Sequence, residues 1–258
     1  MTNHIQKAIK ADIPQIKAIW EECFTTDQEY LRQVFKTLFR LSGVYVYKEK
    51  DEVLSSLFLV PVTYVNNRGS RQRGVYLYAV ATPEKARGRQ LSVKMVEYLS
   101  GKLKQQGENF IITRPAGNSL VNFYRKQGFD TEIKIGGFEL PCEFAREFYP
   151  FLNDPEKKDK AYPIRKMATL LFNDIAGTYP ERFEWDIPTL EFMIETDEFS
   201  RFPVKPRDDC HPTDSHLPLT EDKRATQESD MPPFALLKSL TDLPGESYKN
   251  GFFNFTME

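Results

Sequence analysis

The most informative segment of the sequence is Val80-Ala81-Thr82-Pro83-Glu84-Lys85-Ala86-Arg87-Gly88-Arg89-Gln90-Leu91-Ser92, which takes a β-strand through a short basic loop directly into a helix. A helix that starts in this way presents free backbone N–H groups and its positive end at one point. An anionic pyrophosphate would bind there, held by the amides of residues 87 to 92 and screened by Arg87 and Arg89. The same loop would also serve as a tight turn with solvated arginines.

Strand and helix patterns surround this stretch on both sides. Apolar alternation predicts strands at 5–9, 44–47, 53–65, 75–82 and 110–112. Helical spacing predicts helices from Asp12 to Phe24, from Thr26 to Gly43, at 119–126 and at 90–105, the last with an apolar face of Leu91, Met95, Tyr98, Leu99 and Leu103. The strands from 44 to 82 form an antiparallel meander, whereas the strand–helix–strand unit from 75 to 112 implies a parallel pair. The fold class is therefore α+β, with a mixed, mostly antiparallel twisted sheet flanked by helices.

The sequence pattern changes beyond Pro141. We expect a catalytic domain over residues 1–140, a polar connector over 141–162 and a smaller α+β domain over 163–258. Within the last part, helices are predicted at 164–175 and 187–199, a loop-rich segment at 202–231 and a final strand at 251–255.

Composition and charge limit the class of protein. The 258 residues are 40% hydrophobic and 28% charged, as in ordinary globular proteins, and no apolar run is long enough to cross a membrane. The scattered Cys23, Cys142 and Cys210 suggest no disulfide framework, and the spacing of Cys210, His211 and His216 suggests no metal site. We expect a cytoplasmic protein with no metal and no nucleic-acid or membrane partner. The sequence does not decide the oligomeric state.

A second informative segment, Phe123-Tyr124-Arg125-Lys126-Gln127-Gly128-Phe129, ends a helix with a glycine suited to a left-handed cap. Tyr124 would be a competent general acid for a departing thiolate, because a phenol is protonated at neutral pH. A packing role for this tyrosine is the alternative.

Taken together, the two segments resemble the GCN5-related N-acetyltransferase (GNAT) family over roughly residues 3–140. Arg87-x-x-Gln90-x-Ser92 lies where the family carries Arg/Gln-x-x-Gly-x-Gly/Ala, and Phe-Tyr-x-Lys-x-Gly-Phe is present in full. The resemblance implies acetyl transfer from acetyl-CoA to an amine, with Tyr124 as general acid. It also implies that the CoA pyrophosphate binds at Arg87, Gly88, Arg89, Gln90, Leu91 and Ser92, and that the pantetheine arm pairs with Val80, Ala81 and Thr82. The C-terminal part resembles, more loosely, the second domains of two-part family members, which include degenerate copies of the first.

The chain departs from the family pattern at several positions. Gln90 replaces a glycine, and Gly117 stands where members often carry an asparagine, which leaves the adjacent Asn118 as a candidate cofactor-binding residue. Tyr76 stands where some members carry a carboxylate base, so we expect Tyr76 and Tyr78 to line the acceptor pocket. These departures leave open a non-catalytic acyl-CoA-binding or regulatory module, or a structural adaptor.

The acceptor is suggested by charge alone. Residues 1–140 carry 21 Lys and Arg against 14 Asp and Glu, whereas the remainder carries 14 against 23. The acids are densest at Glu181, Glu184, Asp186, Glu191, Glu195, Asp197 and Glu198. Such a surface would concentrate a polycationic small-molecule amine, unless it is only a solvated helix face.

Overall fold

The structure, a computed structural model, describes residues 4–134, 138–140, 164–196, 204–206, 234–241 and 248. One sheet organises these residues, with its strands in the spatial order β1, β2, β3, β4, β5, β10, β6 and with β8 paired to β3. Within this sheet, all pairs are antiparallel except β4 with β5. The strands are β1 Ile5–Lys7, β2 Gly43–Glu49, β3 Glu52–Val65, β4 Arg71–Ala81, β5 Phe110–Thr113, β6 Thr131–Lys134, β8 Arg182–Glu184 and β10 Phe234–Ser239.

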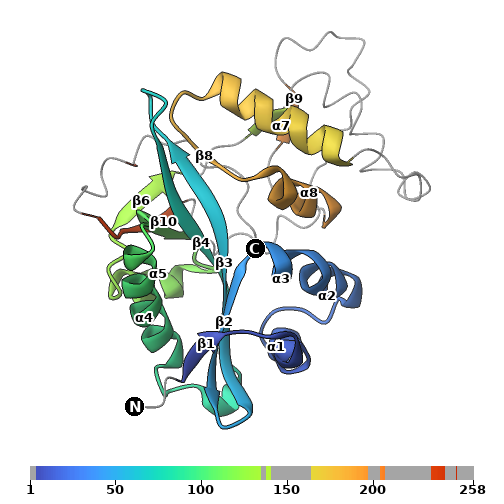
Figure 1. Ribbon diagram of the computed structural model, residues 1–258, viewed down its shortest axis with the longest axis vertical. Helices are drawn as coiled ribbons and strands as arrows, with labels where there is room; N and C mark the ends of the chain where they lie inside the picture. The colour runs from blue at the N-terminus through green and yellow to red at the C-terminus, as the bar shows by residue number, and fades with distance from the viewer. Residues whose placement is uncertain are drawn as a thin grey trace.

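Helices cover both faces of this sheet (Figure 1). One face carries α4 Leu91–Gln105 and α5 Asn118–Arg125. The other carries α1 Ile13–Cys23, α2 Gln28–Gln33, a π-helical stretch Val34–Leu38 and α3 Phe39–Leu41, with α7 Ile164–Thr178 and α8 Ile187–Glu195 further along the same side. The predicted mixed, mostly antiparallel sheet flanked by helices is thus confirmed.

Two hydrophobic cores result, one on each face. The first joins α1 to α8 through buried residues such as Trp20, Phe58, Tyr76, Trp185 and Leu190. The second joins the sheet to α4 and α5 and includes Met95, Tyr124 and Phe129. Alternation along β3 and β4 sends successive side chains to opposite cores, as a sheet buried on both faces requires.

The C-terminal elements complete the sheet of the N-terminal elements. The strand β10 lies between β5 and β6, pairing Leu237 with Ile112 on one side and with Thr131 on the other. The chain therefore returns to the side of β6 almost a hundred residues after leaving it. On the way, β8 extends β3 by pairing along Thr63–Val65, and α7 and α8 join the first core. A separate second domain over residues 163–258 is not confirmed, because its described elements share a sheet and a core with the first part.

The expected elements up to residue 134 are present with small shifts at their ends. Tyr98, predicted on the apolar face of α4, is instead 38% exposed. The predicted connector at 141–162 and the final strand at 251–255 lie outside the described residues. So does most of the 202–231 segment, in which β9 Val204–Pro206 pairs in parallel with β7 Phe138–Leu140.

Candidate functional site

The fourth and fifth strands separate at one end of the sheet. Their pairing covers only Gly74–Tyr76 against Phe110–Ile112, while β4 continues along β3 as far as Ala81. Beyond Tyr76, the edge of β4 that faced β5 therefore lacks its ladder partner among the described strands. Backbone groups on such an edge are available to an extended ligand that adds to the strand.

A bulge bends β4 within this separated part. Ser56 pairs with Ala81 and Phe58 with Tyr78, so Ala79 and Val80 together oppose the single Leu57. Ala79 has a φ of 49°, which is unusual for a residue with a Cβ atom. Backbone strain of this kind is often found at functional sites, where the surrounding structure maintains it.

The loop after β4 presents unpaired amides at the start of α4. A 3-10 turn at Glu84–Ala86 leads to Gly88, with a φ of 78°, and to Gln90, with a φ of 56°. Gln90 is the N-cap of α4, and no side chain caps the helix there. The first intrahelical bond is made by Lys94 N to Gln90 O at 3.1 Å, so the amides of the first turn are available to an anion.

The left-handed backbone of Gln90 explains why a glycine suits this position. Glycine adopts positive φ without steric cost, whereas a residue with a Cβ atom is strained there. Gln90 nevertheless adopts the conformation, so its side chain has not displaced the turn. The geometry therefore fits a bound pyrophosphate, with strain where the family pattern has glycine.

Arg87 and Arg89 are predicted to screen the pyrophosphate. In the structure, both side chains contact other residues of the chain. Arg87 Nε donates to Thr82 O at 3.2 Å, and its guanidinium lies beside the Cys23 thiol. Burial raises the pKa of this thiol, and Arg87 opposes the shift. Arg89 forms an ion pair with Glu49 of β2, and both side chains are substantially exposed. Exposed pairs are weak, so Arg89 could exchange this partner for a phosphate at little cost.

Tyr124 lies in the second core, on α5, and is 6% exposed. Its ring packs against Phe123 and Phe129, with centroids at 5.1 and 5.5 Å. Burial raises the pKa of Tyr124 to about 12, and the Thr113 hydroxyl acts in the opposite direction. The phenol is therefore protonated at neutral pH, as a general acid must be. It is also a packing residue, so the two interpretations of Tyr124 are compatible.

The other expected site residues divide between the surface and the core. Ser92 is half-buried in the first turn of α4, and Asn118 is exposed at the start of α5. Tyr76 and Tyr78 are both buried in the first core, where the Tyr76 ring meets Trp185 at 5.4 Å. The structure thus separates Tyr76 and Tyr78 from Tyr124 by the sheet itself.

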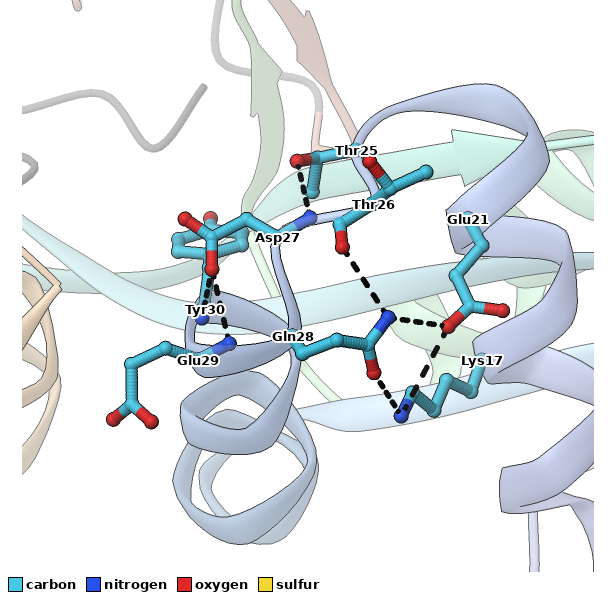
Figure 2. Close-up of polar contacts among 8 residues, drawn as sticks. All are labelled: Lys17, Glu21, Thr25, Thr26, Asp27, Gln28, Glu29 and Tyr30. Carbon is cyan, nitrogen blue, oxygen red and sulfur yellow. Dashed lines mark hydrogen bonds and ion pairs between the residues drawn. The ribbon is translucent and has the colours of Figure 1, made fainter.

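The turn between α1 and α2 fixes Tyr30 against β4. Asp27 caps α2 by accepting from Glu29 N and Tyr30 N at 2.9 and 3.1 Å (Figure 2). Gln28 bridges the two helices by donating to Glu21 at 2.9 Å and accepting from Lys17 at 2.7 Å. The Tyr30 hydroxyl then lies 2.6 Å from that of Tyr78. This ordered turn brings a partly exposed tyrosine to the separated part of β4.

Sequence reasoning missed three residues that support the site. Glu22 Oε1 accepts from Glu84 N at 2.6 Å, which satisfies a free amide of the 3-10 turn that Pro83 cannot cap. Ser55 Oγ donates to Ala81 O at 2.8 Å, and Thr113 Oγ1 donates to Leu77 O at 2.9 Å. Ser55 could have been noticed as a polar residue within the apolar run 53–65. Glu22 and Thr113 carry no such signal, because their contacts depend on packing between distant segments.

The acidic segment is largely engaged in local contacts. Glu184 is buried and pairs with Arg71 and Arg182, both at 2.5 Å, and Glu191 lies 3.6 Å from Arg165. Asp186 caps α8 by accepting from Thr189 N at 2.8 Å, and Glu181 accepts from the Tyr64 hydroxyl at 3.3 Å. Glu195 is exposed. Asp197 and Glu198 lie outside the described residues.

Comparison with known families identifies the first part of the chain. Residues 4–131 match the family described as "Acetyltransferase (GNAT) domain". Through these residues the chain belongs to the GNAT family. The match ends at the start of β6, so β10, which completes the sheet of the GNAT domain, comes from outside the matched residues. No curated protein matches the chain.

Solved structures align with the chain at low identity. A protein from Enterococcus faecalis V583 described as a probable N-acyltransferase is 18% identical, with 52% of this chain and 33% of that one covered and a TM-score of 0.44. A GNAT family N-acetyltransferase from Escherichia coli in complex with CoA is 22% identical, with 48% and 66% covered and a TM-score of 0.39. A GNAT family acetyltransferase from Brucella melitensis in complex with acetyl-CoA is 18% identical, with 46% and 80% covered and a TM-score of 0.38. The chain thus spans about a third of the Enterococcus protein.

Among the helices that the structure describes, none has the length and apolar character needed to cross a membrane. The described residues also contain no group of three or more His, Cys, Asp or Glu side chains that could hold a metal ion.

Proposed function

We propose that the protein is an N-acetyltransferase that moves the acetyl group of acetyl-CoA directly to a primary amine. The observation that carries this proposal is the separation of β4 from β5 beside the uncapped start of α4. The separated edge of β4 can pair with the extended pantetheine arm of acetyl-CoA, and the free amides at the start of α4 can bind its pyrophosphate.

In this proposal acetyl-CoA is a substrate that supplies an activated acyl group and a thiolate leaving group. The amides of residues 87–92 would hold the pyrophosphate, with Arg87 and Arg89 moving from their present partners to screen its charge. The backbone of Val80, Ala81 and Thr82 would pair with the pantetheine arm, and Asn118 is a further candidate contact. Tyr124 would keep its proton on the phenolic oxygen until the amine attacks, and then give it to the departing sulfur.

The principal test is release of free CoA thiol when the protein, acetyl-CoA and a panel of primary amines are mixed. We expect thiol release with at least one amine and a loss of roughly 10- to 1,000-fold in turnover for Tyr124→Phe with acetyl-CoA affinity little changed. The variant keeps the ring that packs against Phe123 and Phe129. A single-turnover rate within about twofold of wild type would leave Tyr124 as a packing residue.

A non-catalytic acyl-CoA-binding or regulatory module is the second candidate, favoured by the strain at Gln90 and the tyrosine at position 76. Both candidates require that acetyl-CoA raises the melting temperature and that Arg87→Ala with Arg89→Ala reduces the rise. Only the enzyme releases thiol. A melting temperature that does not respond to acetyl-CoA would favour the structural adaptor instead.

The acceptor in this proposal is a small-molecule amine, and a polycationic one is the class to test first. Glu195 is exposed and interacts electrostatically with Arg32, whereas Glu191 is half-buried beside Arg165, so the two provide a matched pair of substitutions. If the acidic surface attracts the acceptor, Glu195→Gln will lower the second-order rate constant for a polycationic amine at low salt more than Glu191→Gln does. Equal rates for cationic and neutral amines would leave these acids as surface charge.

A further inference from the structure

The half-buried Lys238 of β10 lies against the turn that ends α5. In this turn, Gln127 N and Phe129 N both donate to Tyr124 O, at 2.9 and 3.3 Å. Lys238 Nζ donates to Gln127 O at 2.8 Å. A side chain from the sheet therefore closes the same turn that holds the backbone of Tyr124.

The same ammonium group also approaches the ring that packs on the phenol. Lys238 Nζ lies 6.0 Å from the centroid of the Phe129 ring, within the range of a cation–π contact. The Phe129 ring is fully buried, and its centroid lies 5.5 Å from that of Tyr124. The stem of Lys238 fills the space beside Gly128, where a Cβ atom would meet Lys238 Cε at 3.6 Å. Lys238 thus contacts both the backbone and the aromatic ring that fix Tyr124.

This lysine comes from a distant part of the chain. Tyr124 and the turn after it belong to the residues that match the GNAT domain, whereas β10 lies beyond them. In the sheet, Lys238 pairs with Ile111 of β5, the strand whose separation from β4 opens the site. Alternation along β10 directs Lys238 to the same side as Leu236, which belongs to the second core with Tyr124. The returning strand therefore connects the helix of the proposed general acid to the sheet.

An ammonium group suits the end of a helix for two reasons. The last carbonyl groups of a helix lack intrahelical partners, and a lysine side chain can bond to carbonyls in this region. Its charge is also favourable at the negative end of the helix dipole, and the bond it makes is charge-assisted. Because Tyr124 lies in the last turn of α5, movement of this end moves the phenol. A displacement of about 1 Å at a reacting group can cost about 100-fold in rate.

We propose that Lys238 is a positioning residue for acyl transfer, which holds the C-terminal turn of α5 and thereby keeps the Tyr124 phenol at the leaving sulfur. The inference rests on the proposed function, because Tyr124 must be the general acid. In the step itself, the amine nitrogen bonds to the acyl carbon, the carbon–sulfur bond breaks, and the Tyr124 proton goes to the sulfur. Lys238 keeps all its protons.

The substitution Lys238→Met removes the charge and the N–H donors but keeps an unbranched side chain beside Gly128. At saturating acetyl-CoA and amine, we expect it to slow single-turnover transfer roughly 10- to 100-fold, with the dissociation constant of acetyl-CoA within about twofold of wild type. Lys102→Met is the matched control, because Lys102 is also half-buried on this side of the sheet and lies over an aromatic ring, that of Tyr45, at 5.0 Å. The control should keep the wild-type rate to within about twofold. An equally small effect of Lys238→Met would overturn the proposal.

A double-mutant cycle separates this role from a purely structural one. If Lys238 acts through the phenol, Lys238→Met will change the single-turnover rate by less than about twofold once Tyr124→Phe is present. The same fractional loss in both backgrounds would show that Lys238 only stabilises the fold, and would overturn the proposal.

Hydrogen exchange distinguishes failure of this inference from failure of the proposed function, because it needs no turnover. We expect Lys238→Met to accelerate exchange of the Gln127 and Phe129 amides by roughly tenfold or more, and Lys102→Met to leave it unchanged. Unchanged exchange in Lys238→Met would show that the lysine does not hold the turn, and would overturn the inference even in an active enzyme. If the amides respond but wild type releases no thiol with any amine, the proposed function fails, and the catalytic role of Lys238 is overturned with it.

Discussion

The substitution Leu237→Ala tests whether the two parts of the chain fold as one unit. Leu237 is completely buried in β10, where it belongs to the first core and its strand joins β5 to β6. Truncation of a buried leucine to alanine costs about 2–5 kcal/mol, a large part of the roughly 5–15 kcal/mol that stabilises a typical protein. For a cost of about 3 kcal/mol and a guanidinium m-value of about 5 kcal/mol/M, the midpoint should fall by about 0.6 M.

The two tryptophans of the chain report separately on its two parts. Trp20 lies in α1 and Trp185 follows β8, and both are buried. Trp185→Phe leaves only Trp20, so fluorescence then follows the N-terminal elements. Trp20→Phe leaves only Trp185, so fluorescence then follows the C-terminal elements. Trp20 Nε1 has no hydrogen-bond partner among the described residues, so phenylalanine loses no bond there.

A single folding unit requires that Leu237→Ala lowers both midpoints by the same amount. The control is Leu120→Ala, the same substitution at a residue that is 38% exposed, and it should shift either midpoint by less than about 0.2 M. If Leu237→Ala shifted the Trp185 transition and left the Trp20 transition in place, residues 163–258 would fold as a separate domain. The sheet that the two parts share would then not be enough to make them unfold together.

Three further results follow from the geometry of the site. Gln90→Gly should raise the free energy of unfolding by about 1 kcal/mol, because it removes the left-handed strain, and a loss in denaturant unfolding would show that the glutamine side chain stabilises the loop. Tyr124 has a folded pKa of about 12, above the unfolded value near 10, so its stabilising contribution is complete below pH 10 and is lost as the pH rises towards 12. Tyr124→Phe should therefore reduce the loss of stability between pH 10 and 12 by about 2–3 kcal/mol, and an unchanged pH dependence would contradict burial of the phenol. Glu22→Ala should speed hydrogen exchange of the Glu84 amide, whereas Glu21→Ala, which alters the contact with Gln28, should not.

Local patterns predicted the elements well because their causes are local. Apolar period and capping chemistry determine where α4 and α5 begin and end, and they depend on neighbours within a few residues. The geometry of the loop between β4 and α4 was predictable for the same reason, since a strand, a glycine and a helix start adjoin in sequence.

Long-range pairing was not predictable from such patterns. The position of β10 between β5 and β6, and of β8 beside β3, depends on which distant edges are left free after the first strands have paired. The sequence analysis predicted no strand at 234–239, where four apolar residues from Phe234 to Leu237 follow one another without alternation. Burial of Tyr124, and the contacts of Glu22 and Thr113, follow from that arrangement and were equally inaccessible.

The packing of the C-terminal elements bears directly on the missing base of the GNAT domain. Tyr76 stands where family members that use a strand carboxylate would carry it, and it is 1% exposed with the Trp185 ring against it at 5.4 Å. A carboxylate in that place would lie among aromatic rings, where burial disfavours its charged form and raises its pKa. The tyrosine at this position and the tryptophan that follows β8 therefore pack together, and this packing suits an aromatic side chain better than a carboxylate. In an enzyme built in this way, an ammonium group has to lose its proton to solvent or to another residue before it attacks.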